Sequence, residues 1–238
     1  MPVKAIATDY DGTLAWHSMV EYSTCTALQK FKDSGRKLIL VTGRELHELY
    51  SIFSSARIFD RIVAENGGLL VDPATNHTQV LGAEPPQDFV NRLRELGVHP
   101  LSVGHTIVAT QETYCSVVQE AIRDMKLDWQ MIPNKGALMV LPGNVDKASG
   151  LKVAMRELGL SGEDVVGVGD AENDHAFLNV CGWSVAVANA LESLKARADI
   201  VTQGSRGAGV EELIGAILEN KLPARTRTSV QTDLIHAP

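Results

Sequence analysis

Two acidic residues follow the first apolar segment of the chain. Asp9 and Asp11 stand just beyond the run Ala5–Ala7, and Gly12 comes directly after them. In extended backbone, residues i and i+2 point to the same side, so both carboxylates can face one cavity at the carboxyl end of a strand. Gly12 permits a tight turn and a close approach of the backbone to a bound anion. Because unpaired buried charge is costly, these are either solvated turn residues or neighbours of a positive group.

Two later segments offer groups that complement an anion. Thr42 and Gly43 follow a second apolar run and precede a predicted helix, whose N-terminal N–H groups favour negative charge. Lys147 stands at the start of another predicted helix, after Asp146. Each has a plainer explanation when taken alone, because Thr-Gly often caps a helix and a lysine is usually solvated.

A second group of carboxylates follows a strand predicted to end at Gly169. Asp170, Asn173 and Asp174 fall within one helical turn, where residues three and four apart share a face. Carboxylates this close repel one another unless a cation joins them, and an oxygen-only ligand set suits Mg²⁺. Together the strand ends offer what a magnesium ion and a phosphoryl group require.

The elements that must position these groups alternate along the chain. Short runs rich in Val and Ile predict buried strands of the kind found in parallel sheets covered on both faces. Besides the first, the predicted strands are Lys37–Val41, Arg61–Ala64, Asp164–Val168, Trp183–Val187 and Asp199–Val201. Apolar residues at helical spacing lie between them, as in Leu151, Ala154, Met155 and Leu158. The pattern predicts an α/β, Rossmann-like doubly wound parallel sheet.

The middle of the chain breaks this alternation. Proline and glycine interrupt it at 82–86 and again at 141–144, which indicates a small inserted α+β unit. The elements predicted for the insert are a helix at about Gln87–Leu96, one or two strands within Leu101–Thr110, a helix at Thr113–Lys126, and strands at Asp128–Ile132 and Ala137–Leu141. The expected organisation is a discontinuous core of residues 1–81 and 143–222, an insert of 82–142, and a mobile tail of 223–238.

Composition excludes several classes of function. The 238 residues carry a net charge of −7, which disfavours nucleic acid as a partner. No apolar run approaches the roughly 20 residues needed to span a bilayer, so no membrane role is expected. Cys25, Cys115 and Cys181 are odd in number and widely spaced, which indicates buried thiols in a reducing compartment. We therefore expect a cytoplasmic protein. The sequence does not indicate its oligomeric state.

Four ordered motifs resemble those of the haloacid dehalogenase-like (HAD) superfamily, in particular its Cof-type branch, type IIB. They are Asp9-Tyr10-Asp11-Gly12-Thr13-Leu14, Thr42-Gly43-Arg44, Lys147 and Gly169-Asp170-Ala171-Glu172-Asn173-Asp174. The patches 65-ENGG-68 and 182-GWSVAVANALESLKARADIVT-202 are also similar to that branch. The resemblance extends to about Leu218 and implies a Mg²⁺-dependent phosphatase of small phosphorylated metabolites.

The resemblance also implies roles for these residues. Asp9 would be the nucleophile that forms an aspartyl-phosphate, and Asp11 the general acid and then the general base. The groups expected to hold the phosphoryl oxygens are Thr42, Gly43, Lys147 and Asn173. The expected metal ligands are Asp9, the Asp11 carbonyl oxygen and Asp170, with Asp174 or Asn173 completing or orienting the shell.

The insert would be the cap that closes over the core and selects the substrate. Its length resembles the minimal caps of archaeal phosphoglycolate phosphatases more than the larger caps of many sugar phosphatases, so either substrate class is open. His105, Asn134 and Lys135 are polar residues near predicted strand ends that could face the substrate, and simple solvent exposure is the alternative. A sugar phosphomutase and a non-catalytic phosphometabolite-binding protein are the alternative functions.

Overall fold

The strand that carries the first acidic motif runs through the middle of the larger sheet. In the computed structural model, which describes residues 3–222, β1 (Ala5–Thr8) is buried along its whole length. It pairs in parallel with β10 (Val165–Gly169) on one side and β2 (Lys37–Val41) on the other. Most residues of these strands are apolar, as burial on both faces requires. The predicted tail, 223–238, lies outside the described residues.

The larger sheet has eight strands in the order β12-β11-β10-β1-β2-β3-β4-β5. The remaining strands are β3 (Arg61–Ala64), β4 (Leu69–Asp72), β5 (His77–Val80), β11 (Trp183–Ala186) and β12 (Ile200–Val201). From β12 to β3 all pairings are parallel, which confirms the predicted α/β class, whereas β4 and β5 add an antiparallel hairpin at one edge. That hairpin was not predicted, because β5 is exposed and polar.

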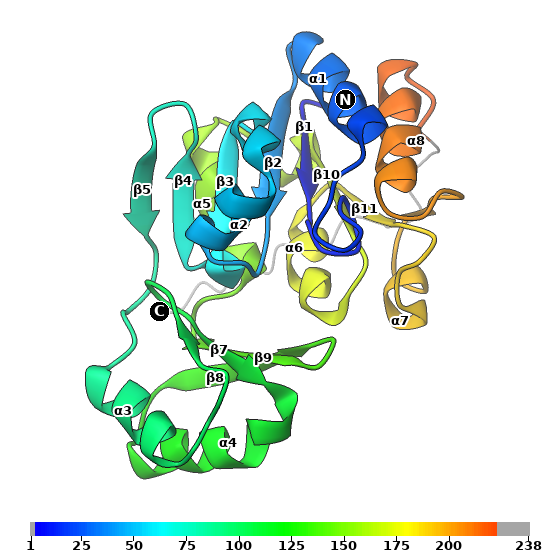
Figure 1. Cartoon of the computed structure of the whole chain (residues 1–238). Coiled ribbons are helices and arrows are strands. Elements are labelled where there is room, and N and C mark those ends of the chain that lie inside the picture. The colour runs from blue at the N-terminus through cyan, green and yellow to red at the C-terminus, as the bar shows by residue number, and fades with distance from the viewer. Residues whose placement is uncertain (1–2, 223–238) are drawn as a thin grey trace, which may run out of the picture.

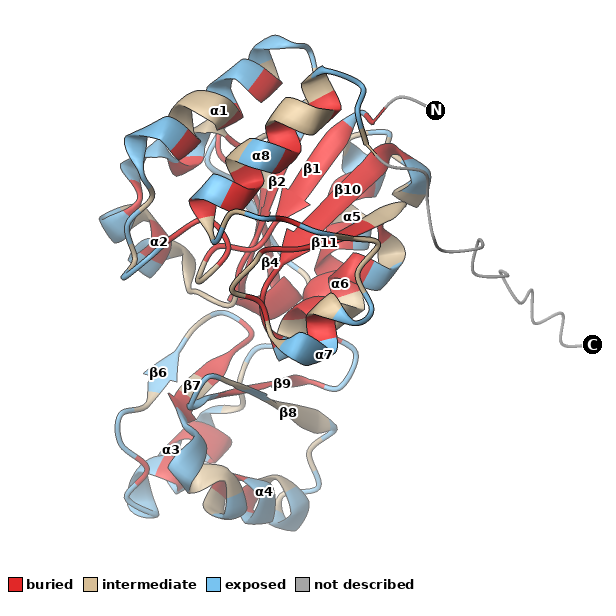
Figure 2. Cartoon of the chain, turned by 90° about the vertical axis from the view of Figure 1, so that its right-hand side faces the viewer, coloured by how far each residue is buried: buried red, intermediate tan, exposed pale blue. Residues whose placement is uncertain are grey.

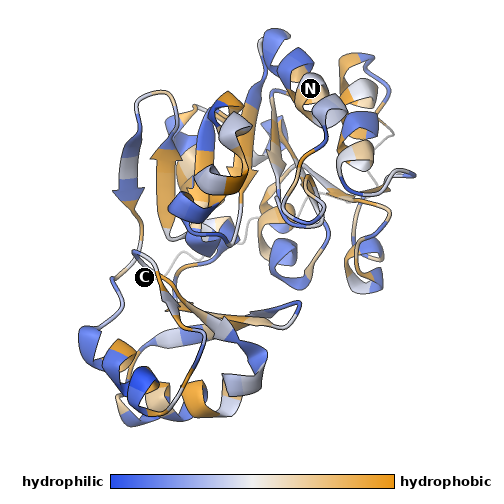
Figure 3. Cartoon of the chain, viewed as in Figure 1, coloured by the Kyte–Doolittle hydropathy of each residue, from blue (hydrophilic) through white to orange (hydrophobic). Residues whose placement is uncertain are grey.

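Helices cover both faces of this sheet. On one face α1 (Tyr22–Asp33) packs beside α8 (Gly207–Leu218), and on the other α5 (Lys147–Glu157) packs beside α6 (His175–Val180), as Figure 2 shows. Two shorter helices, α2 (Leu46–Ile52) and α7 (Glu192–Lys195), complete the core. The strands between these layers are apolar and the outer helical surfaces are polar (Figure 3). The larger hydrophobic cluster is therefore wrapped around β1 and its neighbours.

A second, four-stranded antiparallel sheet lies between β5 and α5 in the sequence, in the order β6-β7-β9-β8. Its elements are α3 (Gln87–Glu95), β6 (Ser102–Val103), β7 (Val108–Gln111), α4 (Cys115–Asp124), β8 (Trp129–Asn134) and β9 (Ala137–Pro142). We call residues 82–142 the cap. Both cap helices cover the sheet face that points away from the core (Figure 1), so the opposite face, with Ile107 and Met139, is turned toward the core.

Two predictions from composition can be compared with this fold. All three cysteines are free thiols, but only Cys181 is buried, whereas Cys25 and Cys115 are half-buried. The expectation that all three are buried was therefore wrong for two of them, which lie on helices with one face toward solvent. Within residues 3–222, no helix combines the length and the apolar character that crossing a bilayer demands.

Candidate active site

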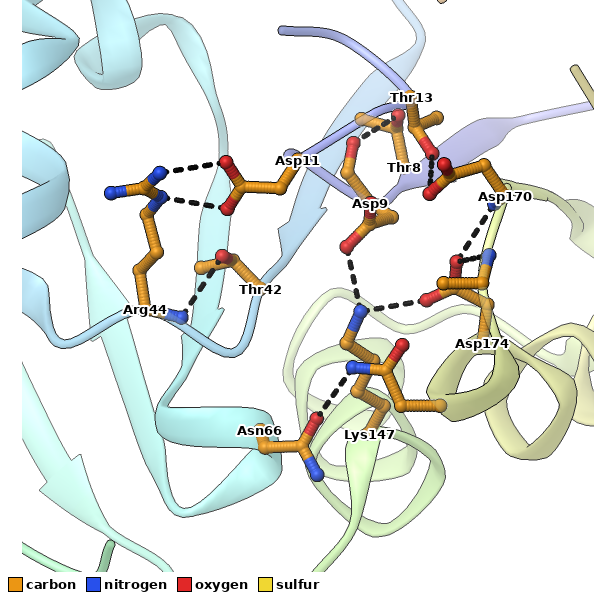
Figure 4. A network of polar contacts seen from close by, with 12 residues as sticks. Thr8, Asp9, Asp11, Thr13, Thr42, Arg44, Asn66, Lys147, Asp170 and Asp174 are labelled. Atoms are coloured by element: carbon orange, nitrogen blue, oxygen red, sulfur yellow. Dashed lines mark hydrogen bonds and ion pairs between the residues drawn. The ribbon is translucent and has the colours of Figure 1, made fainter. Parts of the chain in front are cut away.

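Asp9 lies at the carboxyl end of β1, in the centre of the larger sheet. Its backbone N–H continues the strand pairing by donating to the Val168 carbonyl oxygen at 3.0 Å, and the residue as a whole is only 5% exposed. The Asp9 side chain points toward the start of α5, where Lys147 Nζ donates to Asp9 Oδ1 at 2.6 Å (Figure 4). The sheet thus carries one carboxylate to the edge where ligands bind in open α/β folds.

Lys147 is the cationic centre of the site. It is the first residue of α5, whose start is fixed by a capping box between Asp146 and Ser149. Its side chain is 1% exposed, and Nζ donates to Asp174 Oδ1 at 2.6 Å as well as to Asp9. A buried ammonium group is tolerated only when carboxylates such as these compensate its charge. Lys147 is therefore not a solvated surface lysine, which was the plainer explanation of its place in the sequence.

Two more carboxylates, those of Asp170 and Asp174, come from the loop after β10 and lie close to Asp9. Asp174 is fully buried, and its Oδ2 accepts from the backbone N–H groups of Asp170 and Ala171 at 2.8 and 2.9 Å. Asp170 is 3% exposed, and its Oδ1 accepts from Thr13 Oγ1 at 3.3 Å. The short helical turn Glu172–Asp174 therefore folds back on itself and holds both acids toward β1.

Burial and crowding change the protonation of these groups. Burial, reinforced by the Asp174 charge, raises the pKa of Asp9 from 3.8 to about 7 despite the adjacent ammonium. Burial alone would lower the pKa of Lys147, but the charges of Asp174 and Asp9 outweigh it and raise that pKa. Burial also raises the pKa of Asp170. Negative charge is therefore in excess here, and a further cation would be stabilised.

Asp11 does not face Asp9 in this structure. Both of its carboxylate oxygens accept from Arg44, at 2.7 Å from Nε and 2.7 Å from Nη2, and the side chain turns away from the lysine centre (Figure 4). Arg44 also contacts Ser18 and lies over the Tyr10 ring. The i, i+2 spacing of the two aspartates predicts a shared direction only in extended backbone, but β1 ends at Thr8, before both aspartates, and the Arg44 guanidinium binds the second carboxylate.

Gly12 is required at this turn. Its φ of 91° lies in the region that favours glycine. A Cβ at this position would lie 2.3 Å from Asp170 Oδ2 and 2.7 Å from Lys135 Nζ, so any other residue would displace these side chains. The loop thereby approaches the second acidic group closely.

Of the groups predicted to hold a phosphoryl group, Thr42 and Gly43 lie on the loop after β2. Asn173 lies in the turn after β10. Thr42 is buried, and its Oγ1 accepts the Arg44 N–H at 3.1 Å, which leaves the hydroxyl hydrogen available as a donor. The Asn173 amide donates to Asn66 Oδ1 at 3.2 Å, while Asn173 Oδ1 is buried without a partner among the described residues. A Cβ on Gly43 would lie 3.0 Å from Met139 Sδ, so the cap sheet closes directly over this loop.

The three cap residues predicted near the substrate have different surroundings. His105 lies at the cap–core junction, where its Nδ1 is 3.0 Å from Glu65 Oε1. Asn134 Oδ1 is buried without a partner among the described residues. Lys135 reaches the core, where its Nζ donates to Asp170 Oδ2 at 2.7 Å and to the Asp11 carbonyl oxygen at 3.3 Å. Of the three, Lys135 is therefore the one that contacts the aspartates after β1 and β10.

Several residues of the site were not assigned a role from the sequence, and three of them make central contacts. Arg44 holds Asp11, and Asn189 donates to the Gly12 carbonyl oxygen at 2.9 Å and to Asp170 Oδ2 at 3.4 Å. Glu65 is buried and accepts from the His105 and Thr106 N–H groups at 3.1 and 2.8 Å, which ties the cap to the core. Each was an unassigned polar residue just after a predicted strand, and that position was the available signal.

The donor set fits a hard divalent cation. Asp9, Asp170 and Asp174 each offer a carboxylate oxygen, and these atoms lie within 4.8 Å of one another. All three residues are buried, and each ligand atom is an oxygen, as Mg²⁺ prefers. Asp174 already accepts from Lys147 and from two backbone N–H groups, so it is better placed to orient the shell than to enter it.

The chain is similar in sequence and in fold to known hydrolases. A sequence model described as haloacid dehalogenase-like hydrolase matches residues 6–126 and 103–214. The phosphoglycolate phosphatase of Methanothermobacter thermautotrophicus is 32% identical over 222 residues, which cover 89% of this chain and 97% of that protein. A haloacid dehalogenase-like hydrolase from Bacteroides thetaiotaomicron has a TM-score of 0.79 at 20% identity, covering 90% of this chain and 99% of that one. A sugar phosphatase of HAD subclass IIB has a TM-score of 0.74 at 19% identity, covering 92% and 99%.

Proposed function

The chain belongs to the haloacid dehalogenase-like hydrolases, and from this premise we propose that it is a Mg²⁺-dependent phosphatase of small phosphorylated metabolites. The observation that carries the proposal is the buried contact of Lys147 Nζ with both Asp9 and Asp174 at 2.6 Å. A nucleophilic carboxylate beside a fixed ammonium, at the carboxyl edge of a parallel sheet, is suited to accept a phosphoryl group.

Asp9 acts as the nucleophile in the proposed reaction. One of its oxygens forms a bond to phosphorus while the bond from phosphorus to the leaving oxygen breaks, which gives an aspartyl-phosphate and a free alcohol. Lys147 lies beside Asp9 and stabilises the negative charge of the transferring group. Thr42 offers its hydroxyl to a phosphoryl oxygen, and Asn173 offers its amide donor once it leaves Asn66.

Asp11 transfers the protons. It gives a proton to the leaving oxygen in the first step, and in the second it takes one from the water that hydrolyses the aspartyl-phosphate, which releases inorganic phosphate. Both Asp11 oxygens contact Arg44 in this structure. The side chain must therefore turn from Arg44 toward Asp9 in the catalytic cycle, a rotation that a single side chain can make.

The residues that would hold Mg²⁺ are Asp9, the Asp11 carbonyl oxygen and Asp170, with Asp174 orienting them. The ion would supply positive charge that offsets the repulsion between the anionic nucleophile and an anionic substrate. The excess of buried carboxylates over ammonium groups supports this assignment.

The substrate is proposed to be a small phosphate ester, phosphoglycolate or a sugar phosphate. The Methanothermobacter relative is a phosphoglycolate phosphatase, which supports the first, and the subclass IIB relative is a sugar phosphatase, which supports the second. Met139 of the cap lies over Gly43, so a cap side chain adjoins the loop proposed to hold the phosphoryl group. Three free thiols support a reducing compartment, and we place the enzyme in the cytoplasm.

Phosphate release from a panel of esters tests the proposal. The panel contains phosphoglycolate, glycerol phosphates, pentose and hexose phosphates and an aryl phosphate, each assayed with Mg²⁺ and with EDTA. We expect release that requires Mg²⁺ and is absent in Asp9→Asn. Isomerised substrate without free phosphate would indicate a phosphomutase instead, and metal-dependent binding of an ester without turnover would indicate a non-catalytic binding protein.

A further inference from the structure

We propose that Lys135 and a divalent metal ion compete for the same oxygen atoms, so that metal binding releases the tip of the cap hairpin from the core. The inference rests on the metal site of the proposed function and adds a residue that sets its affinity. Lys135 stands in the two-residue turn between β8 and β9, at the tip of the hairpin that extends toward the core (Figure 1).

The ammonium group of Lys135 contacts two groups expected to bind the metal. Its Nζ is 2.7 Å from Asp170 Oδ2 and 3.3 Å from the Asp11 carbonyl oxygen. A magnesium ion held by the same oxygens would lie within a few ångströms of the ammonium group, and the two positive charges would repel each other. Each cation therefore weakens the binding of the other to these atoms.

The hairpin turn is built to present this lysine. Lys135 and Gly136 have φ values of 49° and 86°, and the Asn134–Ala137 pair closes the two-residue loop. Such turns favour Asn-Gly, because a residue with a Cβ is strained in the left-handed region. Lysine at the first position is thus a local exception, and exceptions of this kind concentrate where a side chain has a function.

Exposure differs between the two partners of this ion pair. The Asp170 side chain is 3% exposed, whereas the Lys135 side chain is 45% exposed. When the pair separates, water solvates the ammonium, but the buried carboxylate still needs a cation. A metal ion that replaces Lys135 meets this need and leaves no buried charge unpaired. Exchange of one cation for the other is therefore feasible.

A second contact between cap and core does not depend on either cation. Glu65 accepts from the His105 and Thr106 N–H groups, at the opposite side of the cap sheet from β8. Release of Lys135 would free the hairpin tip while this contact holds the cap in place. The expected motion is therefore a pivot about Glu65, not a detachment of the cap.

Metal affinity in the absence of substrate tests the competition. Mn²⁺, which favours the same oxygen ligands, is titrated into the intact protein, and free Mn²⁺ is counted by electron paramagnetic resonance. Lys135→Met removes the charge at similar length, and Lys135→Asn removes it with a residue that tolerates the turn. We expect both variants to bind Mn²⁺ roughly fivefold more tightly, the scale of a half-exposed ion pair.

Lys126→Met is the matched control. Lys126 is an exposed cap lysine with a similar φ of 52°, but it follows α4, a helix on the face of the cap sheet that points away from the core. We expect its Mn²⁺ affinity to equal that of the wild type. Unchanged or weaker binding in both Lys135 variants, beside normal wild-type binding, overturns the competition alone. No Mn²⁺ binding by the wild type overturns the metal site of the proposed function as well.

Hydrogen exchange gives a readout that does not depend on affinity. In the wild type, Mn²⁺ should speed amide exchange at Lys135–Ala137 and leave Thr106 protected. In Lys135→Met, the turn should already exchange quickly without metal. Exchange at the turn that does not respond to Mn²⁺ in the wild type overturns the release of the hairpin.

Discussion

Aspartates lie at both ends of the larger sheet, but they are separate at one end and clustered at the other. At the amino end, Asp60, Asp164 and Asp199 each precede a strand, and they are separate from one another. Each accepts a backbone N–H, from Leu38, Ser161 and Ser184 respectively, all at 2.9 Å. At the carboxyl end, Asp9, Asp170 and Asp174 are brought together around Lys147.

The two kinds of surroundings shift the pKa of an aspartate in opposite directions. Hydrogen bonds from the Ser161 N–H and from Lys4 lower the pKa of Asp164 to about 2, whereas burial raises that of Asp9 to about 7. The first carboxylate stabilises the fold at neutral pH and the second destabilises it. The carboxyl end thus retains a group that folding alone disfavours, which is typical of sites selected for chemistry.

The largest expected effect is on the rate of phosphate release, which should depend on an aspartate at the carboxyl end of the sheet and not on one at the amino end. Asp9→Asn should lower the rate of phosphate release by roughly four or more orders of magnitude, because the nucleophile is lost. Asp164→Asn is the same substitution at the other end and should leave the rate unchanged. Initial rates on the best substrate of the panel measure both. An Asp9→Asn rate within tenfold of the wild type would contradict the assignment.

Removal of the buried ammonium should damage both activity and stability. Lys147→Met leaves two buried carboxylates without their cation, so we expect a loss of about 3 kcal/mol in unfolding free energy and a roughly hundredfold lower rate. Urea unfolding and initial rates give the two values. Lys152→Met, at an exposed position on the same helix, is the control and should change neither.

The pH dependence of stability should carry the signature of Asp9. Its pKa is about 7 in the folded protein and 3.8 when unperturbed, so the folded state holds the extra proton between these values. Stability should therefore fall as pH rises from about 4 to 7, by about 3 kcal/mol, and Asp9→Asn should remove this fall. Urea unfolding at pH 5 and pH 8 with EDTA tests it. Equal slopes in both proteins would show that Asp9 is not the source.

The smallest effect is expected at the amino end. Asp164 has a lowered pKa, so its contribution is present above about pH 4 and is lost as pH falls toward 2. Asp164→Asn should lower the melting temperature slightly at pH 7, and the difference from the wild type should shrink on acidification. A difference that grows at low pH would reverse the assigned sign.

Much of the fold could be predicted because strand and helix patterns here agree with tertiary packing. The predicted strands at Lys37–Val41 and Arg61–Ala64 match the structure. The predicted helix at Gln87–Leu96 ends one residue early, at Glu95. The hairpin β4–β5 was missed because its outer strand is polar, and the alternation that marks a half-buried strand is absent there.

The site was less accessible to sequence reasoning, because its geometry depends on contacts between distant residues. Thr42, Lys147 and the acidic residues at strand ends can be recognised from their residue types and their positions in the sequence. That Arg44 would turn Asp11 away depends on a side chain 33 positions later in the chain. The contact of Lys135 with Asp170 depends on how the cap sits over the core, and no local pattern encodes that placement.

The place of β1 in the middle of the sheet also constrains how the protein is made. β10, which pairs with β1, begins 160 residues later in the sequence (Ala5 to Val165), and Asn189 comes later still. At translation rates of about 5–20 residues per second, Asp9 leaves the ribosome roughly 10–30 s before these partners exist. Nascent and truncated chains therefore lack the assembled charge cluster. Phosphatase activity therefore requires that synthesis has passed β10 and Asn189, and until then the apolar strand β1 lacks a neighbouring strand of the finished sheet.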